Sequence, residues 1–144
     1  MIKNVIITGP PKVGKSTLLE QVTTRFPNKV GFITKEIKEN NTRIGFEIEN
    51  HLNERAVLAS INFQTPYRVS KYWVNVENLD YIVSKTSSFS REDILYLDEI
   101  GEMELFSAKF KKLVLEFLDS ENIFIGTITN VYTHEFIENI RKRR

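Results

Sequence analysis

The stretch that most constrains this chain is residues 7–17, which read ITGPPKVGKST. It begins at the end of a short apolar run, Val5–Ile7, which is typical of a buried parallel strand. Gly9 to Ser16 then matches the pattern G-x-x-x-x-G-K-[ST], which forms a loop between a strand and a helix. Behind the loop, Leu18, Leu19, Val22 and Phe26 recur at helical spacing, and Pro27 closes the predicted helix. The chain is therefore expected to begin with a strand–loop–helix unit.

A loop of this kind binds phosphate. Gly9 and Gly14 allow backbone conformations that other residues avoid, so that successive N–H groups can surround an anion. The following helix presents its positive end to the same anion. Lys15 supplies a charge for the β- and γ-phosphates, and the Ser16 hydroxyl is a ligand for Mg²⁺. The predicted nucleotide-binding residues are Gly9, Pro10, Pro11, Lys12, Val13, Gly14, Lys15, Ser16 and Thr17.

A second motif, ILYLDEIGEME, supplies acids that complement such a loop. Asp98 follows the predicted strand Ile94–Leu97, and open α/β sheets bind ligands at the carboxyl ends of their strands. We therefore expect Asp98 to hold Mg²⁺ together with Ser16. Glu99 is the predicted catalytic base that takes a proton from the attacking water, while Lys15 stabilises charge on the γ-phosphoryl group.

The remaining sequence alternates predicted strands and helices. VGFITKEI predicts a strand, and the turn ENNT after it predicts a hairpin near Ile37–Glu47. VENLDYIVSKTSS, SAKFKKLVLEFLDS and THEFIENIRKRR predict helices, and NIFIGTIT predicts another buried strand. The apolar face of the second of these helices is Phe110, Leu113, Val114, Phe117 and Leu118. In residues 51–76 the apolar side chains recur with neither helical nor strand spacing over any length. We expect one α/β domain over residues 1–144, with a mostly parallel sheet covered by helices and an antiparallel hairpin extension.

Taken together, the motifs resemble those of the THEP1-type nucleoside-triphosphatase family. The matching segments keep the family's order along nearly the whole chain: GPPKVGKSTLL, VGFITKEIKENNTRIGFEIE, VSKYWVNVENL, LDEIGEMEL and IFIGTITNVYTHEFIENIRKR. The resemblance implies a RecA-like, three-layer αβα P-loop NTPase fold. It also implies Mg²⁺-dependent hydrolysis of several nucleoside 5′-triphosphates, ATP and GTP among them, to NDP and phosphate with relaxed base selectivity.

Three features depart from the family pattern, two of them single residues and the third the C-terminal end. Lys12 stands where the family usually has glycine, and Asn130 stands where it often has histidine. Members of the family continue beyond the position of Arg144 into another strand, so the chain resembles a form shortened at its C-terminus. We expect either a loosely held base or a sheet that is one strand short.

Weaker candidates lie elsewhere. Glu102 and Glu104 are expected to form a solvated acidic edge, and His51 and His134 to be surface residues. Further candidates for contact with the γ-phosphate are Arg43, Arg68, Thr127 and Thr129.

The composition narrows the range of partners. Twenty lysines and arginines balance 19 aspartates and glutamates, so nucleic acid is an unlikely partner. No apolar stretch approaches the roughly 20 residues of a membrane helix, and the N-terminus lacks the pattern of a signal peptide. We expect a cytoplasmic protein that binds nucleoside triphosphates and no membrane. The oligomeric state stays open, with a monomer favoured.

Two alternatives use the same loop. A nucleoside or nucleotide kinase would pass the γ-phosphate to an acceptor, which residues 51–76 could house. A nucleotide-gated module would bind nucleic acid or protein with little turnover.

Overall fold

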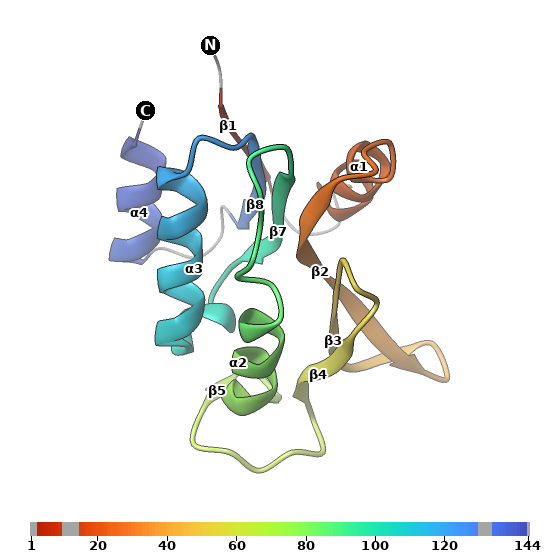
Figure 1. Ribbon diagram of the computed structural model, residues 1–144. Helices are drawn as coiled ribbons and strands as arrows, with labels where there is room; N and C mark the ends of the chain where they lie inside the picture. The colour runs from red at the N-terminus through yellow and green to blue at the C-terminus, as the bar shows by residue number, and fades with distance from the viewer. Residues whose placement is uncertain (1–2, 10–14, 130–133, 144) are drawn as a thin grey trace.

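The computed structural model describes residues 3–9, 15–129 and 134–143. Within them, an eight-stranded sheet has the order β1-β8-β7-β2-β3-β4-β6-β5 (Figure 1). The elements in chain order are β1 (Asn4–Gly9), α1 (Lys15–Thr23), β2 (Lys29–Glu39), β3 (Thr42–Asn50), β4 (Arg55–Ser60), β5 (Arg68–Val69), β6 (Tyr72–Val74), α2 (Val76–Ser84), β7 (Ile94–Ile100), the 3₁₀ turn η1 (Glu104–Phe106), α3 (Ala108–Asp119), β8 (Phe124–Thr129) and α4 (Glu135–Lys142).

The sheet has a parallel half and an antiparallel half. β1, β8, β7 and β2 run parallel, whereas β3, β4, β6 and β5 continue the sheet in antiparallel fashion. The predicted hairpin is confirmed as β2–β3. Its central residues, Asn40 and Asn41, have φ of 51° and 63°, as a two-residue type I′ turn requires. The antiparallel extension is larger than this hairpin because residues 51–76 contribute three further short strands.

Three layers follow from the alternation of side chains along the buried strands. On β7, Leu95 and Leu97 pack into the main hydrophobic core, while Tyr96 between them packs with Leu19 of α1 on the other face. α1 thus covers one face of the parallel half. The main core lies between the sheet and the helices α2, α3 and α4 (Figure 1).

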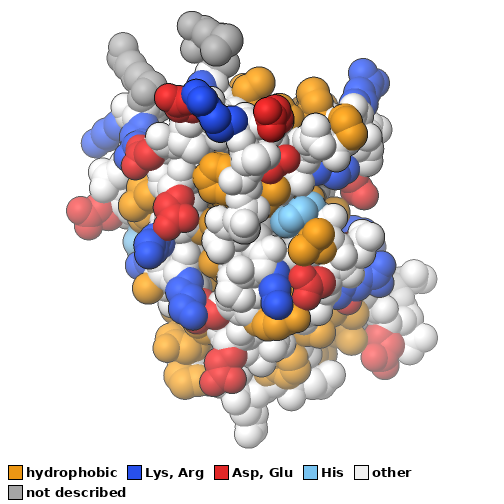
Figure 2. All heavy atoms as spheres, viewed as in Figure 1, with side chains coloured by type: hydrophobic (Ala, Val, Ile, Leu, Met, Phe, Trp, Pro, Cys, Tyr) orange, Lys and Arg blue, Asp and Glu red, His pale blue; other side chains and the backbone are white. Residues whose placement is uncertain are grey.

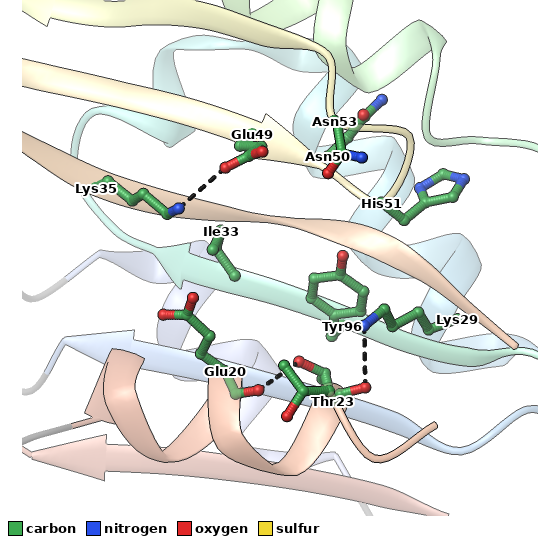
Figure 3. Close-up of a pocket in the computed structure, with 11 residues that line it drawn as sticks. Glu20, Thr23, Lys29, Ile33, Lys35, Glu49, Asn50, His51, Asn53 and Tyr96 are labelled. Carbon is green, nitrogen blue, oxygen red and sulfur yellow. Dashed lines mark hydrogen bonds and ion pairs between the residues drawn. The ribbon is translucent and has the colours of Figure 1, made fainter. Parts of the chain in front are cut away.

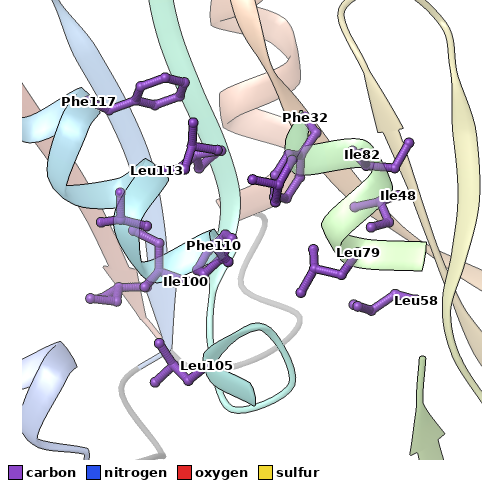
Figure 4. Packing of buried hydrophobic residues seen from close by; sticks show 14 of the residues in the cluster. Phe32, Ile48, Leu58, Leu79, Ile82, Ile100, Leu105, Phe110, Leu113 and Phe117 are labelled. Carbon is purple, nitrogen blue, oxygen red and sulfur yellow. The ribbon is translucent and has the colours of Figure 1, made fainter. Parts of the chain in front are cut away.

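The main core confirms the predicted apolar face of α3. Its five predicted residues are all buried, and Phe110 and Phe117 have no exposed surface. The ring of Phe110 lies 5.9 Å from that of Phe32 of β2, and Leu79 and Ile82 of α2 belong to the same core (Figure 4). Ser107 caps the helix by accepting a hydrogen bond from the Phe110 N–H at 3.0 Å.

α1 is shorter than predicted. It ends at Thr23, before Pro27, and Leu18 is 48% exposed. Its buried residues are Lys15, Leu19 and Thr23, which follow one another at intervals of four along a single stripe. Val22 of the sequence pattern is half-buried and packs against the same cluster as Leu19, whereas Leu18 lies beside this stripe and stays in solvent. Among the residues that the structure describes, none of the helices is both long and apolar enough to cross a bilayer.

Candidate active site at the carboxyl edge of the parallel strands

Lys15 joins the two motifs found in the sequence. It is the first residue of α1, only 8% of its side chain is exposed, and its Nζ donates to the carbonyl oxygen of Gly9 at 2.6 Å. The same Nζ forms an ion pair with Glu99 Oε2 at 3.4 Å. Gly9 ends β1 with φ of 154°, a backbone conformation that favours glycine. The strand–loop–helix unit and the acidic motif therefore meet at one edge of the sheet.

Asp98 is held from both neighbouring strands. Thr127 of β8 donates its hydroxyl to Asp98 Oδ1 at 2.6 Å, and Thr34 of β2 donates its hydroxyl to the Asp98 main-chain oxygen at 2.6 Å. Asp98 is buried, and this burial raises the pKa of its carboxyl, while Thr127 and Ser16 lower it. Although Ser16 lies close enough to act on this pKa, the second carboxyl oxygen, Oδ2, has no well-formed hydrogen bond.

The strand that carries the acids is irregular at this point. β7 continues through Ile100, three residues beyond the predicted end at Leu97. Its register with β8 shifts from Leu97 opposite Gly126 to Ile100 opposite Ile128. Two residues of β7 therefore face one residue of β8, as in a β-bulge. Asp98 consequently points to Thr127, while Glu99 reaches Lys15.

Glu104 corrects the sequence prediction of a solvated acidic edge. It is only 4% exposed, and burial raises the pKa of its carboxyl well above 4.5, with a further upward contribution from Glu99. A Cβ atom at Gly101 would lie 3.2 Å from Glu99 Oε1 and 3.3 Å from Glu104 Oε1. The missing side chain of Gly101 thus leaves the space in which the two carboxyl groups approach each other.

Glu99 itself has the properties of a poised base. Burial raises the pKa of its carboxyl, the charge of Lys15 lowers it, and the charge of Asp98 raises it. Its side chain is 36% exposed, so that water can reach it. A carboxylate with a raised pKa that faces solvent can accept a proton from water.

The site also fits a divalent cation. Asp98 Oδ2 is a buried carboxylate oxygen without a hydrogen-bond partner, and the hydroxyl of Ser16 lies near the same carboxyl group. The described residues contain no group of three acidic, histidine or cysteine side chains that could hold a metal alone. Mg²⁺ needs only a few protein ligands when phosphate oxygens and water molecules complete its coordination shell.

Part of the predicted nucleotide loop lies outside the described residues. These positions are Pro10, Pro11, Lys12, Val13 and Gly14, and Asn130 lies outside them as well. The described part of the loop is Gly9 together with Lys15, Ser16 and Thr17 in the first turn of α1, where Ser16 and Thr17 are exposed.

The two candidate arginines, Arg43 and Arg68, contact residues of the antiparallel extension and not the described residues of the site. Arg43 donates from Nε to the Tyr72 hydroxyl at 2.9 Å and pairs with Glu36 at 3.1 Å. Arg68 donates to the main-chain oxygen of Ser70 and lies over the ring of Trp73. Within the described residues, neither arginine contacts the acids or Lys15.

Sequence patterns missed one residue of the site, Thr34, and misplaced one residue outside it, His51. Thr34 was not singled out, although GFIT and GTIT both place a threonine behind an apolar run, which is a usable signal. His51 was expected at the surface. It is instead half-buried, and its Nδ1 accepts a hydrogen bond from the Gly31 N–H at 3.3 Å.

A strand that ends in glycine, a helix that opens with lysine, and a buried aspartate at the carboxyl edge of parallel strands define a P-loop αβα protein. Comparison with known proteins identifies the family to which this P-loop protein belongs. The NTPase family model matches residues 4–144, and the chain belongs to that family. It is a nucleoside-triphosphatase.

Named relatives and solved structures agree with this assignment. The chain is 40% identical to the nucleoside-triphosphatase THEP1 of Thermotoga maritima, with 96% of this chain and 80% of that relative covered. It is 35% identical to the THEP1 of Methanocaldococcus jannaschii, covering 92% and 81% of the two chains. The crystal structure of THEP1 from Aquifex aeolicus superposes with a TM-score of 0.84 at 31% identity, covering 96% of this chain and 84% of that one.

Proposed function

We propose that this nucleoside-triphosphatase hydrolyses Mg²⁺-bound nucleoside 5′-triphosphates to NDP and phosphate, with ATP and GTP among its substrates and with relaxed base selectivity. The observation that carries the proposal is the meeting of Lys15, Glu99 and the unpartnered Asp98 Oδ2 at one edge of the sheet. Lys15 and Glu99 are the proposed catalytic residues, and residues 9–17 form the proposed nucleotide-binding loop.

Asp98 and Ser16 are the residues that would hold Mg²⁺. An ion held there would supply positive charge that offsets the charge of the β- and γ-phosphates. Thr127 and Thr34 keep the Asp98 carboxyl in place, because each donates a hydrogen bond to it or to its main chain. The free Oδ2 is the oxygen left to face the cation.

Lys15 changes partner when the triphosphate binds. Without nucleotide its ammonium is divided between the Gly9 carbonyl oxygen and Glu99. The γ-phosphate offers a stronger anionic partner to the same ammonium. Once Lys15 turns to the phosphate, the carboxylate of Glu99 loses its ion pair and can accept the proton of the attacking water.

The expected partners follow from charge. On the face shown in Figure 2, lysine and arginine side chains are interspersed with aspartate and glutamate side chains. A nucleic-acid partner usually meets a clustered basic area, so such a partner is not part of this proposal. The cytoplasmic location and the monomeric state stay predictions of the sequence.

Phosphate release from ATP, GTP, CTP and UTP by Glu99→Gln tests the role of the base. We expect turnover to fall by about 10²- to 10⁴-fold, since one positioned base contributes about that much. Nucleotide affinity should be kept or raised, because Lys15 loses its competing partner. Glu102→Gln, which removes a neighbouring carboxylate outside the ion pair, is the matched control. Turnover of Glu99→Gln equal to wild type would show that another group is the base, and turnover that requires an added nucleoside would favour a kinase.

A further inference from the structure

A second cavity lies on the α1 face of the sheet. Its volume is about 400 Å³, within the range of small-molecule sites. It is bounded by α1, by β2, and by the end of β3 with the turn that follows it (Figure 3). None of the described residues of the nucleotide site, which are Gly9, Lys15–Thr17, Asp98 and Glu99, lines it.

One cation in this cavity lacks an anionic partner. Lys29 donates from Nζ to the main-chain oxygen of Thr23 at 3.2 Å and forms no ion pair with any described residue. Lys35, at another part of the same cavity, pairs with Glu49 at 3.0 Å. Figure 3 shows both contacts as dashed lines. Two acids line the cavity as well: Glu49 is the partner of Lys35, and Glu20 forms no ion pair with any described residue. Figure 3 shows the Glu20 carboxyl on the side of Ile33, away from the Lys29 ammonium. The ammonium that is open to an added anion is therefore that of Lys29.

Neutral hydrogen-bond donors lie around the same cavity. The Nδ1 atom of His51 accepts the Gly31 N–H, so the proton of the neutral ring is on Nε2, and burial lowers the pKa of this histidine. Asn50 Nδ2 is buried without a partner, while Oδ1 of the same side chain accepts two backbone N–H groups at 3.0 Å. The Tyr96 hydroxyl points into the cavity (Figure 3). A free ammonium beside such groups is complementary to an anion.

We propose that this cavity is a second ligand site that binds a small organic anion, a carboxylate or a phosphate monoester, through Lys29. Ile33 and the ring of Tyr96 supply an apolar wall, so the cavity suits an anionic group with an organic body rather than a bare ion. The site is separate from triphosphate hydrolysis and does not depend on the roles proposed for Lys15 or Glu99.

The C2–H resonance of His51 in a proton NMR titration reports on this cavity. The chain has only two histidines, so this resonance is assigned with a His51→Gln variant. Ribose 5-phosphate, succinate and inorganic phosphate are the probes, titrated into the Lys15→Ala variant so that the nucleotide loop competes less for phosphate. We expect a saturable shift with at least one organic anion at millimolar concentration. The phosphate and carboxylate probes distinguish the two sources of the anionic group.

Variants of Lys29 decide the assignment. Lys29→Gln should weaken binding by about tenfold or more, because one charge-assisted hydrogen bond is lost. Lys29→Arg should bind within about threefold of the parent protein, since it keeps the charge. Lys35→Gln is the matched control and should leave affinity nearly unchanged, because the Lys35 ammonium is already paired. No saturable shift with either organic probe, or equal affinity in Lys29→Gln, overturns the proposal. Binding of inorganic phosphate as tight as that of both organic anions also overturns the proposal.

Discussion

At the scale of single residues, three carboxyl groups shape the active site by being removed from water to different degrees. Asp98 and Glu104 are buried, whereas Glu99 keeps about a third of its side chain exposed, at 36%. Burial is the largest cause of the raised pKa of all three. Only Glu99 combines this shift with access to water, which separates the candidate base from its two neighbours.

Glu104→Gln should flatten the pH dependence of stability. Because the pKa of Glu104 is raised in the folded state, the folded protein binds its proton more tightly than the unfolded chain does. The free energy of unfolding of the wild-type protein should therefore fall as the pH rises from 4.5 toward the pKa of Glu104 in the folded state. The expected slope is about 1.4 kcal/mol per pH unit. A glutamine of the same shape carries no proton to lose. Urea unfolding of the nucleotide-free protein at about pH 5 and about pH 8 measures the difference.

The control for this experiment is Glu102→Gln, a substitution of the same kind two positions earlier in a residue that is not fully buried. It should leave the wild-type pH dependence in place. If Glu104→Gln lost as much stability as wild type over the same interval, the carboxyl of Glu104 would not be the group that titrates.

At the scale of elements, the β2–β3 hairpin is directed by its turn. Asn40 and Asn41 both take the left-handed backbone region, which asparagine tolerates better than most residues. The strands that it joins differ in their neighbours. β2 pairs with β7 in parallel and with β3 in antiparallel fashion, so it is the strand where the two halves of the sheet meet.

Asn41→Ala should destabilise the protein by about 1 kcal/mol, because alanine pays the steric cost of the left-handed conformation without a polar side chain to offset it. Asn41 has φ of 63°. Asn41→Gly is the matched variant and should be at least as stable as wild type, since an Asn-Gly pair suits this turn. Chemical denaturation compares the two. Equal stability of the alanine and glycine variants would mean that the turn has another conformation in solution.

Gly31 allows β2 and β7 to lie side by side. A Cβ atom there would come within 1.9 Å of the Tyr96 main-chain oxygen and 2.7 Å of the Tyr96 ring. The absence of a side chain lets Tyr96 turn its ring toward α1 at the wall of the second cavity.

At the scale of the whole molecule, the nucleotide site exists only because distant segments meet. The Lys15–Glu99 pair spans 84 positions of sequence. Asp98 depends on β2 and β8, which flank β7 in the sheet but not along the chain. A ligand that binds this edge therefore stabilises the folded molecule as a whole.

A non-hydrolysable nucleoside triphosphate with Mg²⁺ should raise the midpoint of thermal unfolding by several degrees. At a ligand concentration of about 100 times Kd, the gain is about 2.7 kcal/mol. Removal of the metal with EDTA should abolish most of this gain, because Asp98 then faces the triphosphate without a cation between them. Lys15→Ala should show little gain, whereas Lys35→Ala, at the second cavity, should respond as wild type does. A metal-independent midpoint would contradict the proposed roles of Asp98 and Ser16.

The sequence by itself determined the local units of this protein. The P-loop pattern, the ENNT turn and the apolar face of α3 were all predictable, because each depends on backbone preference or on a period within a few residues. The family resemblance extended this prediction to the αβα fold. Only the tertiary structure decided that Glu104 is buried, that Thr34 and Thr127 both bind Asp98, and that Lys29 lines a second cavity. Those facts depend on which strands become neighbours and in which register, and no period within a short segment of sequence encodes such long-range pairing.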